Sequence, residues 1–523
     1  MGENENWNNE GCSKMNYILA HDLGTSGNKA TLYDDEGRRI GSALVEYPTH
    51  FFNGSWAEQD PEDWWRAVCE SSKRLLAESG IAPGDIAVVA LSGQMMGMTP
   101  VNAAGEALRP SLLYCDQRAV TEAAALESRL GLARFYGIVG HRISASYTLE
   151  KLMWLKANEP EVYAQTAMTL CAKDFVNFRL TGRRITDFSD ASGTNAFDIN
   201  TFRWSDEVLA AAEIPAALFP EAVDSTTIIG RLTPEAAAAT GLLAGTPVAA
   251  GGGDGSCAGV GAGCVAPGSA YNCMGSSSWI ALTVKKPIVD AEMRTMNWAH
   301  CVPGYLHPSG TMQTAGSSIK WLAENLCAEE AAEAARLGCS KYALIDQKAA
   351  AVPVGANGVM FLPYMLGERT PWWNPDARGV FAGMNLATKR EDLMRAVLEG
   401  VALNLGYIVD IFRQHVPFET GLRLIGGGAR SSVFRQMLAD ATGCTIRTLK
   451  STADATSMGA AIVGGVACGL FPGFDVADKL LAVDETTTPI EANVAFYRRR
   501  LATMIAAYHG LENVYQALKG EQK

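Results

Sequence analysis

A short strand, a glycine-hydroxyl turn and a second strand occur twice in this 523-residue chain, nearly half its length apart. The first copy contains the turn Gly24-Thr25-Ser26, and the second contains Gly275-Ser276-Ser277. Apolar residues flank both turns, as in buried strands. A duplicated half would bring the two turns face to face across a cleft, whereas two unrelated hairpins would give the same local pattern. The repeat favours an α/β chain of two lobes and leaves the second explanation open.

The beginning of the chain predicts a strand meander and not a strand–helix–strand unit. In chain order, the expected elements of the first half are strands at 17–22, 29–33 and 39–45, a helix at 61–79 and a strand at 86–92. In the second half they are strands at 269–274, 279–284 and 422–425 and helices near 432–441 and 457–462. A capping box, Thr388-x-x-Glu391, opens a further long helix with an apolar stripe. A coarse boundary between the halves falls near Gly263.

Charge and composition exclude several classes of protein. The net charge is -12 with dispersed basic residues, so a nucleic-acid partner is not expected. The 12 cysteines form no C-x-x-C pair, which indicates reduced thiols and a cytoplasmic protein. About 18 consecutive apolar residues, the minimum for a membrane helix, occur nowhere. Residues 1–15 are rich in Asn and Glu, a composition that predicts a disordered tail.

Familiar nucleotide and metal motifs are absent or incomplete. No Gly-Lys dipeptide exists, which excludes a P-loop, and the 7 histidines include no His-Glu-x-x-His. The run from Gly253 to Ala266 superficially matches a dinucleotide fingerprint, but no βαβ unit surrounds it. The 52 glycines exceed the usual share of about 7%. Part of this excess stands in turns that suit close approach to a ligand.

Two aspartates accompany these glycine turns. Asp22 ends the first strand, where its carboxylate would hold hydrated magnesium beside a phosphate-binding turn. Asp254 follows an apolar strand and three glycines, so it would project into the cleft. A carboxylate there suits the base of phosphoryl transfer, which accepts the proton of the attacking hydroxyl. With an ordinary pKa near 4, Asp254 would be ionised at neutral pH.

An ordered set of motifs resembles the FGGY carbohydrate kinases, and within them the xylulose kinases. The resemblance extends from Tyr17 to about Leu481. Its motifs are Asp22-Leu-Gly-Thr-Ser-Gly-x-Lys29, Ser92-Gly-Gln-Met95, Asp116-x-Arg118, Ser146-Tyr-Thr-Leu-Glu-Lys151-Leu-Met-Trp154, Ser189-Asp-Ala-Ser-Gly-Thr194, Gly251-Gly-Gly-Asp254, Gly379-Val-Phe-Ala-Gly383 and Gly426-Gly-Gly-Ala-Arg-Ser431. The family implies two ribonuclease-H-like lobes, as in actin, hexokinase and heat-shock ATPases, with a central cleft for ATP and magnesium. It implies an N-terminal lobe at 16–262, a C-terminal lobe at 263–481 and a helical extension at 482–523.

The resemblance also implies roles for individual residues. Asp254 would be the catalytic base. The magnesium and phosphate residues would be Asp22, Gly24, Thr25, Ser26 and Lys29, with Asp22 holding the ion through water. The sugar would be bound by Gln94, Met95, Met96, Asp116 and Asp254. ATP would be bound by Gly275, Ser276, Ser277, Gly427, Gly428 and Ala429.

Two departures leave the acceptor sugar open. Met96 stands where well-known bacterial xylulose kinases resemble Gly-Gln-Met-His-Gly, and Tyr114-Cys115 stands where they resemble Trp-Asn. We expect D-xylulose, with another ketopentose, a polyol or a sugar acid as the alternative. A nucleotide-gated binding protein, a silent sugar sensor and a nicotinamide-dependent oxidoreductase are the rival classes, and a homodimer is left open. Four residues also have simpler structural interpretations. Lys29 would be a solvated strand residue and Met95 a core residue, and Arg118 and Lys151 would be structural ion-pair partners.

Overall fold

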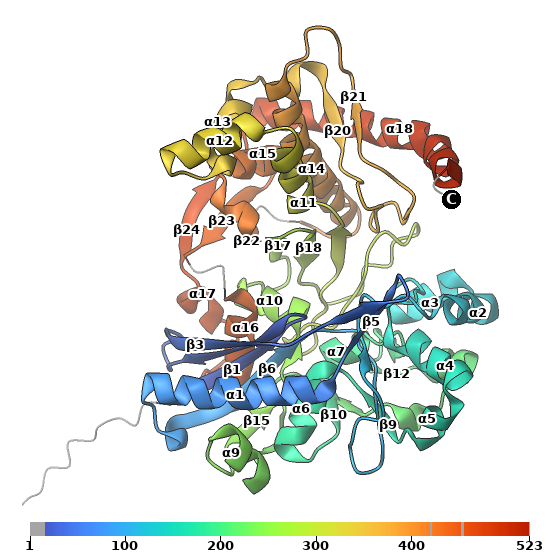
Figure 1. Ribbon diagram of the computed structural model, residues 1–523, viewed down its shortest axis with the longest axis vertical. Helices are drawn as coiled ribbons and strands as arrows, with labels where there is room; N and C mark the ends of the chain where they lie inside the picture. The colour runs from blue at the N-terminus through green and yellow to red at the C-terminus, as the bar shows by residue number, and fades with distance from the viewer. Residues whose placement is uncertain (1–15, 419–420, 451–453, 522–523) are drawn as a thin grey trace, which may run out of the picture.

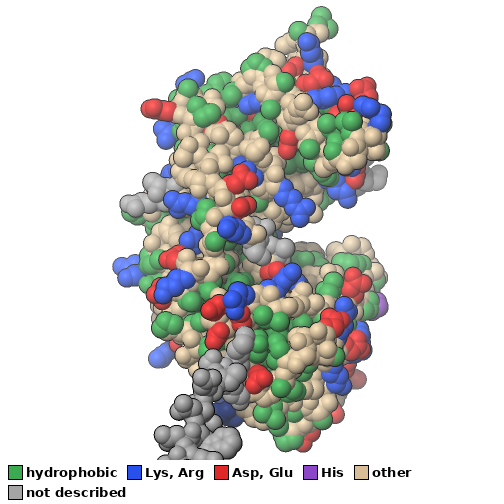
Figure 2. All heavy atoms as spheres, turned by 90° about the vertical axis from the view of Figure 1, so that its left-hand side faces the viewer, with side chains coloured by type: hydrophobic (Ala, Val, Ile, Leu, Met, Phe, Trp, Pro, Cys, Tyr) green, Lys and Arg blue, Asp and Glu red, His purple; other side chains and the backbone are tan. Residues whose placement is uncertain are grey.

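The computed structural model describes residues 16–418, 421–450 and 454–521. The chain forms two bodies, the first half below and most of the second half above in the view of Figure 1. Figure 2 shows the molecule hollowed between them at one edge. The tail predicted at 1–15 lies outside the described residues. None of the described helices combines the length and apolar character needed to cross a bilayer.

The N-terminal sheet begins with the predicted meander. Its path runs β3-β2-β1-β6-β15-β14, and β16 also pairs with β6. The bounds are β1 (Tyr17–Leu23), β2 (Gly27–Tyr33), β3 (Arg39–Glu46), β6 (Ile86–Gly93), β14 (Ile228–Arg231), β15 (Pro247–Ala249) and β16 (Gly252–Gly253). The meander strands are antiparallel, while β6 is parallel to both β1 and β15. The chain ends of β1 and β6 therefore meet at one edge of this sheet.

The C-terminal sheet has the same strand directions and the same order over its first five strands; its edge strand follows the fifth strand in the chain, whereas the edge strand of the N-terminal sheet precedes it. Its path runs β19-β18-β17-β22-β23-β24, with an antiparallel meander followed by parallel strands and a last antiparallel strand. The bounds are β17 (Ala270–Met274), β18 (Ser278–Leu282), β19 (Ser309–Met312), β22 (Gly421–Gly426), β23 (Thr445–Leu449) and β24 (Val483–Thr487). The two glycine turns are thus equivalent parts of a duplicated ribonuclease-H-like unit, which excludes the alternative of unrelated hairpins.

Helices cover both sheets and enlarge both lobes. Helix α1 (Pro61–Ser79) covers β2 and β3 and keeps the predicted bounds. The other main N-terminal helices are α2 (Val120–Leu130), α3 (Leu132–Val139), α4 (Thr148–Asn158), α6 (Ala172–Thr181), α7 (Phe188–Ser192), α8 (Asp206–Ala212) and α9 (Pro234–Thr240). The C-terminal ones are α11 (Gly316–Asn325), α12 (Ala328–Leu337), α13 (Lys341–Ala351), α14 (Arg390–Arg413), α15 (Ser432–Thr442) and α18 (Glu491–Glu521).

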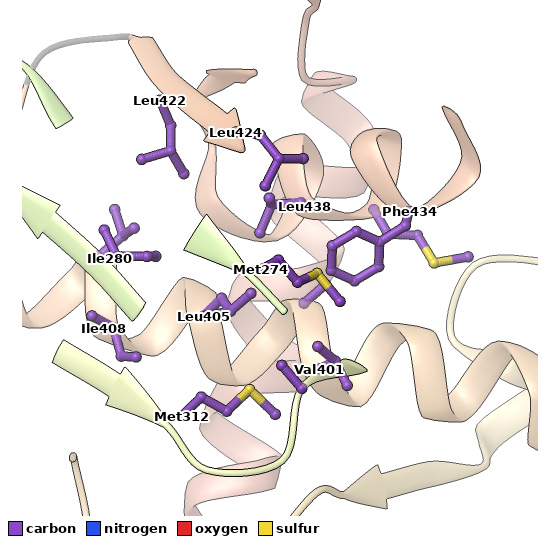
Figure 3. Packing of buried hydrophobic residues seen from close by; sticks show 14 of the residues in the cluster. Met274, Ile280, Met312, Val401, Leu405, Ile408, Leu422, Leu424, Phe434 and Leu438 are labelled. Atoms are coloured by element: carbon purple, nitrogen blue, oxygen red, sulfur yellow. The ribbon is translucent and has the colours of Figure 1, made fainter. Parts of the chain in front are cut away.

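The core of the C-terminal lobe lies between its sheet and α14. Figure 3 shows Ile280, Leu422 and Leu424 from the strands facing Leu405 and Ile408 of α14. All five side chains are at most 1% exposed. The predicted apolar stripe of this long helix is therefore its buried face, except that Leu393 is only partly buried.

The start of α14 differs from the sequence prediction. The capping-box pattern predicts that Thr388 caps the helix opposite Glu391, but the helix begins at Arg390 after Lys389. The Lys389 N–H donates to the carboxylate of Asp392 at 2.8 Å, whereas the Thr388 hydroxyl accepts from Asn385 in the preceding turn. The Thr388 hydroxyl therefore stabilises the turn and Asp392 caps the helix.

Two helices rich in small residues join the lobes. They are α10 (Asp254–Gly261) of the first half and α16 (Ala455–Ala467) of the second half, and α16 also packs on β1 and β6 of the lower lobe (Figure 1). A Cβ on Gly459 would lie 1.9 Å from the carbonyl oxygen of Cys257, and one on Gly261 would lie 1.7 Å from that of Ala455. The predicted run of small residues on α16 thus permits backbone contact between the halves.

This contact predicts a large cost for one added methyl group. Gly459→Ala should lower the urea midpoint of unfolding, because overpacking a tight contact typically costs about 1–3 kcal/mol. Gly510→Ala is the matched control, since Gly510 is also inside a helix but has nothing within 4 Å of the Cβ that alanine would add. Its expected effect is a gain of up to about 1 kcal/mol from helix propensity. Equal midpoints for the two variants would contradict the role given to the α10–α16 contact.

Candidate active site

Asp254 is the first residue of α10 and faces a cavity between the lobes. The cavity has a volume of about 290 Å³. Thr25 from the first glycine turn and Ser277 from the second line the same cavity. The two turns therefore meet beside Asp254, as the sequence repeat predicted for a duplicated chain.

The environment of Asp254 changes its expected ionisation. Its side chain is open to the cavity but lies deep between the two lobes. This enclosure is the main cause that raises its pKa to about 7, and the negative charge of Asp22 adds to the shift. The expectation of an ordinary pKa near 4 was therefore wrong. A base with a pKa near neutrality is well matched to proton transfer at physiological pH.

The backbone before Asp254 is held by a chain of buried hydrogen bonds. The Gly253 N–H donates to the Ser189 hydroxyl at 2.8 Å, and that hydroxyl donates to the Asp187 carboxylate at 2.5 Å. Lys173 is fully buried and pairs with Asp187 at 3.1 Å, and also with Asp174 and Asp190. Met95 packs directly against this backbone, since a Cβ on Gly253 would lie 2.5 Å from the sulfur of Met95. Asp254 thus extends from a fixed loop.

Asp22 lies at the end of β1, on the same side of the cleft as Asp254. The Ser92 hydroxyl donates to its carboxylate at 3.1 Å, while burial raises its pKa. Two carboxylates that repel each other in partly enclosed positions suit a divalent cation, which carboxylate oxygens and water bind. The residues present therefore fit the predicted magnesium ion. Lys29 forms an ion pair with Asp454, so its ammonium joins the lobes in addition to facing Asp22.

The lining of the cavity contains only part of the predicted sugar site. Met95, Met96 and Asp254 line it, together with Gly255, Ser256, Thr25, Tyr114, Tyr147, Ser277, Trp279, Met296, Trp298, His307, Ser309, Thr311 and Arg369. Gln94 and Asp116 do not line it and are buried behind the wall. The Gln94 amide donates to Gln59 at 2.8 Å, and Asp116 pairs with Arg118 and accepts from the Ala57 N–H. Both side chains support the wall in this structure, and their role in sugar binding stays a prediction.

The sequence reasoning missed an aromatic wall of this cavity. His141 stacks on Tyr147 with ring centres 5.2 Å apart and lies 4.2 Å from the ring of Trp298. Burial lowers the pKa of His141 to about 3, so this ring is neutral. Tyr147 stands inside a family motif and Trp279 begins a predicted strand, and both were usable signals. Trp298 and Arg369 lie in segments with no such signal.

A second cavity, of about 480 Å³, lies in the C-terminal lobe. Three predicted ATP residues, Gly275, Gly427 and Gly428, line it. Ser277 lines the first cavity, so the Gly275–Ser277 turn borders both. The remaining two predicted ATP residues are Ser276 and Ala429. The Ser276 carbonyl accepts from the N–H groups of Ala315 and Ser317, and the Ala429 carbonyl accepts from the Arg435 guanidinium.

Helix α13 adds a wall to the second cavity that no motif indicated. Tyr342 and Asp346 from α13 line it together with Phe434 and Ser431. Burial raises the pKa of Asp346, and a hydrogen bond with Ser431 opposes the shift. This wall therefore offers an aromatic face and a carboxylate near the glycines of the 426–428 turn.

Comparison with known proteins identifies the family. The N-terminal domain of the FGGY family of carbohydrate kinases matches residues 17–261, and its C-terminal domain matches 270–468. The chain belongs to the FGGY family of carbohydrate kinases. This FGGY kinase is 33% identical to the xylulose kinase of Escherichia coli (strain K12), over 94% of this chain and 98% of that protein. It is 28% identical to the gluconokinase of Bacillus subtilis (strain 168), over 97% and 98%.

A solved structure agrees with this assignment. The xylulose kinase from Rhodospirillum rubrum superposes with a TM-score of 0.87 at 28% identity, over 96% of this chain and 100% of that one. The rival classes of nucleotide-gated binding protein and nicotinamide-dependent oxidoreductase are set aside by this membership, because the family is one of carbohydrate kinases.

The raised pKa of Asp254 predicts the pH dependence of this FGGY kinase. A base must be deprotonated to act, so kcat/KM for the sugar should fall as the pH drops below about 7. The loss should approach tenfold per pH unit between about pH 6 and 5. Initial rates of ADP release at fixed ionic strength, with the coupling enzymes tested separately at each pH, measure this. A profile that stays flat from about pH 5.5 to 8 would indicate an ordinary aspartate and contradict the assignment.

Proposed function

We propose that this FGGY kinase transfers the terminal phosphoryl group of ATP to a hydroxyl of D-xylulose, giving D-xylulose 5-phosphate. The observation that supports this most strongly is the Gly275–Ser277 turn, which borders both the nucleotide cavity and the cavity of Asp254. A nucleotide in the first cavity would extend its phosphates over this turn toward the base in the second. The two substrates would then react where the cavities join.

In this proposal Asp254 orients the attacking hydroxyl of the sugar. Its carboxylate accepts a hydrogen bond from that hydroxyl and then receives the proton, as the hydroxyl oxygen bonds to the terminal phosphorus and ADP leaves. The hydrogen bonds from Gly253 to Ser189 and from Ser189 to Asp187 keep the base in place while the proton moves. Little rearrangement of the protein is needed at that moment.

The phosphate groups would be held by the two glycine turns and by Asp22. We assign Gly24, Thr25 and Ser26 to the transferred phosphate, and the Gly275–Ser277 turn to the phosphates of ATP. Asp22 would hold Mg²⁺ through water, and this ion, when bound, neutralises charge that develops on the phosphate oxygens. The Lys29–Asp454 ion pair would keep β2 in position beside the first turn.

The lining of the sugar cavity supports a small polyhydroxylated acceptor. The flat apolar faces of Trp279 and Trp298 suit the C–H side of a sugar, while Ser309, Thr311 and Tyr147 offer hydroxyl groups. The relative from E. coli and the structure from R. rubrum are both xylulose kinases by name. We therefore place D-xylulose first among the acceptors.

A sugar acid is the second candidate, and one residue favours it. The Arg369 guanidinium borders the cavity, and its side chain bonds within the described chain to Gln313 at 3.2 Å. A guanidinium open to a cavity suits a carboxylate, which it can bind with two parallel hydrogen bonds. The gluconokinase relative is consistent with this alternative.

Replacement of the base separates catalysis from binding. Asp254→Asn should lower sugar-dependent ADP release by at least about 10²–10⁴-fold, the usual contribution of a general base. ATP binding should persist, because the nucleotide cavity lies in the other lobe. Asp35→Asn, in the exposed β2–β3 turn, is the matched control and should retain full activity. Undiminished turnover in Asp254→Asn would remove Asp254 from the mechanism.

A screen of acceptors decides between the two substrate classes. ADP release should be measured with ketopentoses, aldoses, polyols and sugar acids, for the wild type and for Met96→His. We expect D-xylulose to have the highest kcat/KM of these acceptors. It should remain the best acceptor in Arg369→Ala. If gluconate ranks first and loses its activity in Arg369→Ala, the enzyme is a sugar-acid kinase and the xylulose proposal is wrong.

A further inference from the structure

Lys151 of α4 is a buried amine without an acidic partner. Its side chain is fully buried, and no described carboxylate lies within ion-pair distance of its Nζ atom. The nearby Asp116 pairs with Arg118 instead. Burial lowers the pKa of Lys151 to about 7, which reflects how unfavourable this position is for a charge. A lysine that only filled space would cost stability at this position.

The amine donates two hydrogen bonds, one to a residue that lines the sugar cavity and one to the residue that precedes another lining residue. Nζ lies 3.0 Å from the carbonyl oxygen of Met96 and 2.5 Å from that of Ser146. Met96 lines the cavity in the turn after β6, and Tyr147, which follows Ser146, lines it at the start of α4. One side chain thus connects two segments that lie far apart in the sequence.

The turn that Lys151 holds is strained. Met96 has a φ of +65°, in the left-handed region that residues with a Cβ adopt at a cost. Such backbone persists when surrounding contacts over-determine it, and it is common where a ligand is held. The Thr148 hydroxyl adds a second tie from the same helix to this turn, donating to the Gly97 carbonyl at 3.0 Å. The Met96 carbonyl accepts a hydrogen bond from Lys151, and Met96 also lines the cavity.

We propose that Lys151 is a positioning residue for the acceptor sugar, holding the Met95–Met96 turn and the Ser146–Tyr147 segment at a fixed spacing beside the cavity. This role deepens the proposed function and rests on it. Lys151 contacts no substrate. It acts through the two carbonyl groups, and either ionisation state of its amine keeps the N–H donors that the role requires.

The proposal predicts a selective loss of sugar affinity. Lys151→Met keeps the length of the side chain and removes both donors, so KM for D-xylulose should rise about 10–100-fold, as for lost hydrogen bonds to a charged group. KM for ATP should stay within about twofold, because the nucleotide cavity lies in the other lobe. Quenching of Trp279 and Trp298 fluorescence by D-xylulose gives the binding constant without turnover. Lys151→Gln, whose amide still has donors, should show a smaller rise.

A control on the same helix and a second substitution isolate the mechanism. Lys156→Met replaces a partly exposed lysine of α4 and should leave both KM values unchanged. In a Met96→Gly background, where the left-handed turn costs little, Lys151→Met should raise KM by less than about threefold. Coupling of this kind is expected only if Lys151 acts through the backbone of residue 96.

Hydrogen exchange provides a test that does not depend on the substrate. Amides of residues 94–97 should exchange at least about tenfold faster in Lys151→Met than in the wild type and by a smaller factor in Lys151→Gln, while those of α14 should not change. Unchanged exchange at 94–97, or an equal loss of kcat with no rise in KM for the sugar, overturns the proposal. A wild type inactive toward D-xylulose contradicts the proposed substrate, and the exchange experiment still decides the role of Lys151.

Discussion

The contact between α10 and α16 is the constraint on which the architecture of this enzyme depends. Each helix comes from a different half of the chain, and glycines let their backbones touch at Gly261 and Gly459. The same short helix that ends in this contact begins with Asp254. Asp254 is therefore attached directly to the joint between the lobes.

The lower lobe supports this base with charges that are costly to bury. Lys173, Asp174, Asp187 and Asp190 are all nearly inaccessible, and an uncompensated buried ion costs about several kcal/mol. The single lysine cannot neutralise three carboxylates, and burial raises the pKa of Asp190 well above its usual range. These buried charges hold the Ser189 hydroxyl against the backbone that precedes Asp254. The cluster therefore costs stability but fixes the position of Asp254.

Local patterns predicted the fold well, because strands, glycine turns and amphipathic helices have short periods. The meander, α1 and the strand–turn repeat were found from residues adjacent in the sequence. The roles of side chains that depend on partners distant in the sequence were harder to predict. Asp116 is oriented by Arg118 and the Ala57 N–H, and the pKa of Asp254 depends on enclosure between lobes. Neither can be read from spacing. Asp346 of the nucleotide cavity belongs to a helix with no motif at all.

The duplicated turns are held in a way that prepares the site before substrates arrive. In the first turn, the Gly24 N–H bonds to the Gly27 carbonyl and the Tyr47 hydroxyl donates to the Gly24 carbonyl at 2.5 Å. In the second, the Gly275 N–H bonds to the Ser277 carbonyl, and the N–H of Gly316 donates to the Gly275 carbonyl at 3.1 Å.

A Cβ on Gly316 would lie 2.3 Å from that carbonyl oxygen, so glycine is needed for α11 to reach the turn. Each turn is thus anchored by hydrogen bonds from its own lobe. Movement of the lobes can then change the distance between two preformed turns without reshaping either. Donors that are already oriented avoid the free-energy cost of reorganisation when charge develops on the transferred phosphate.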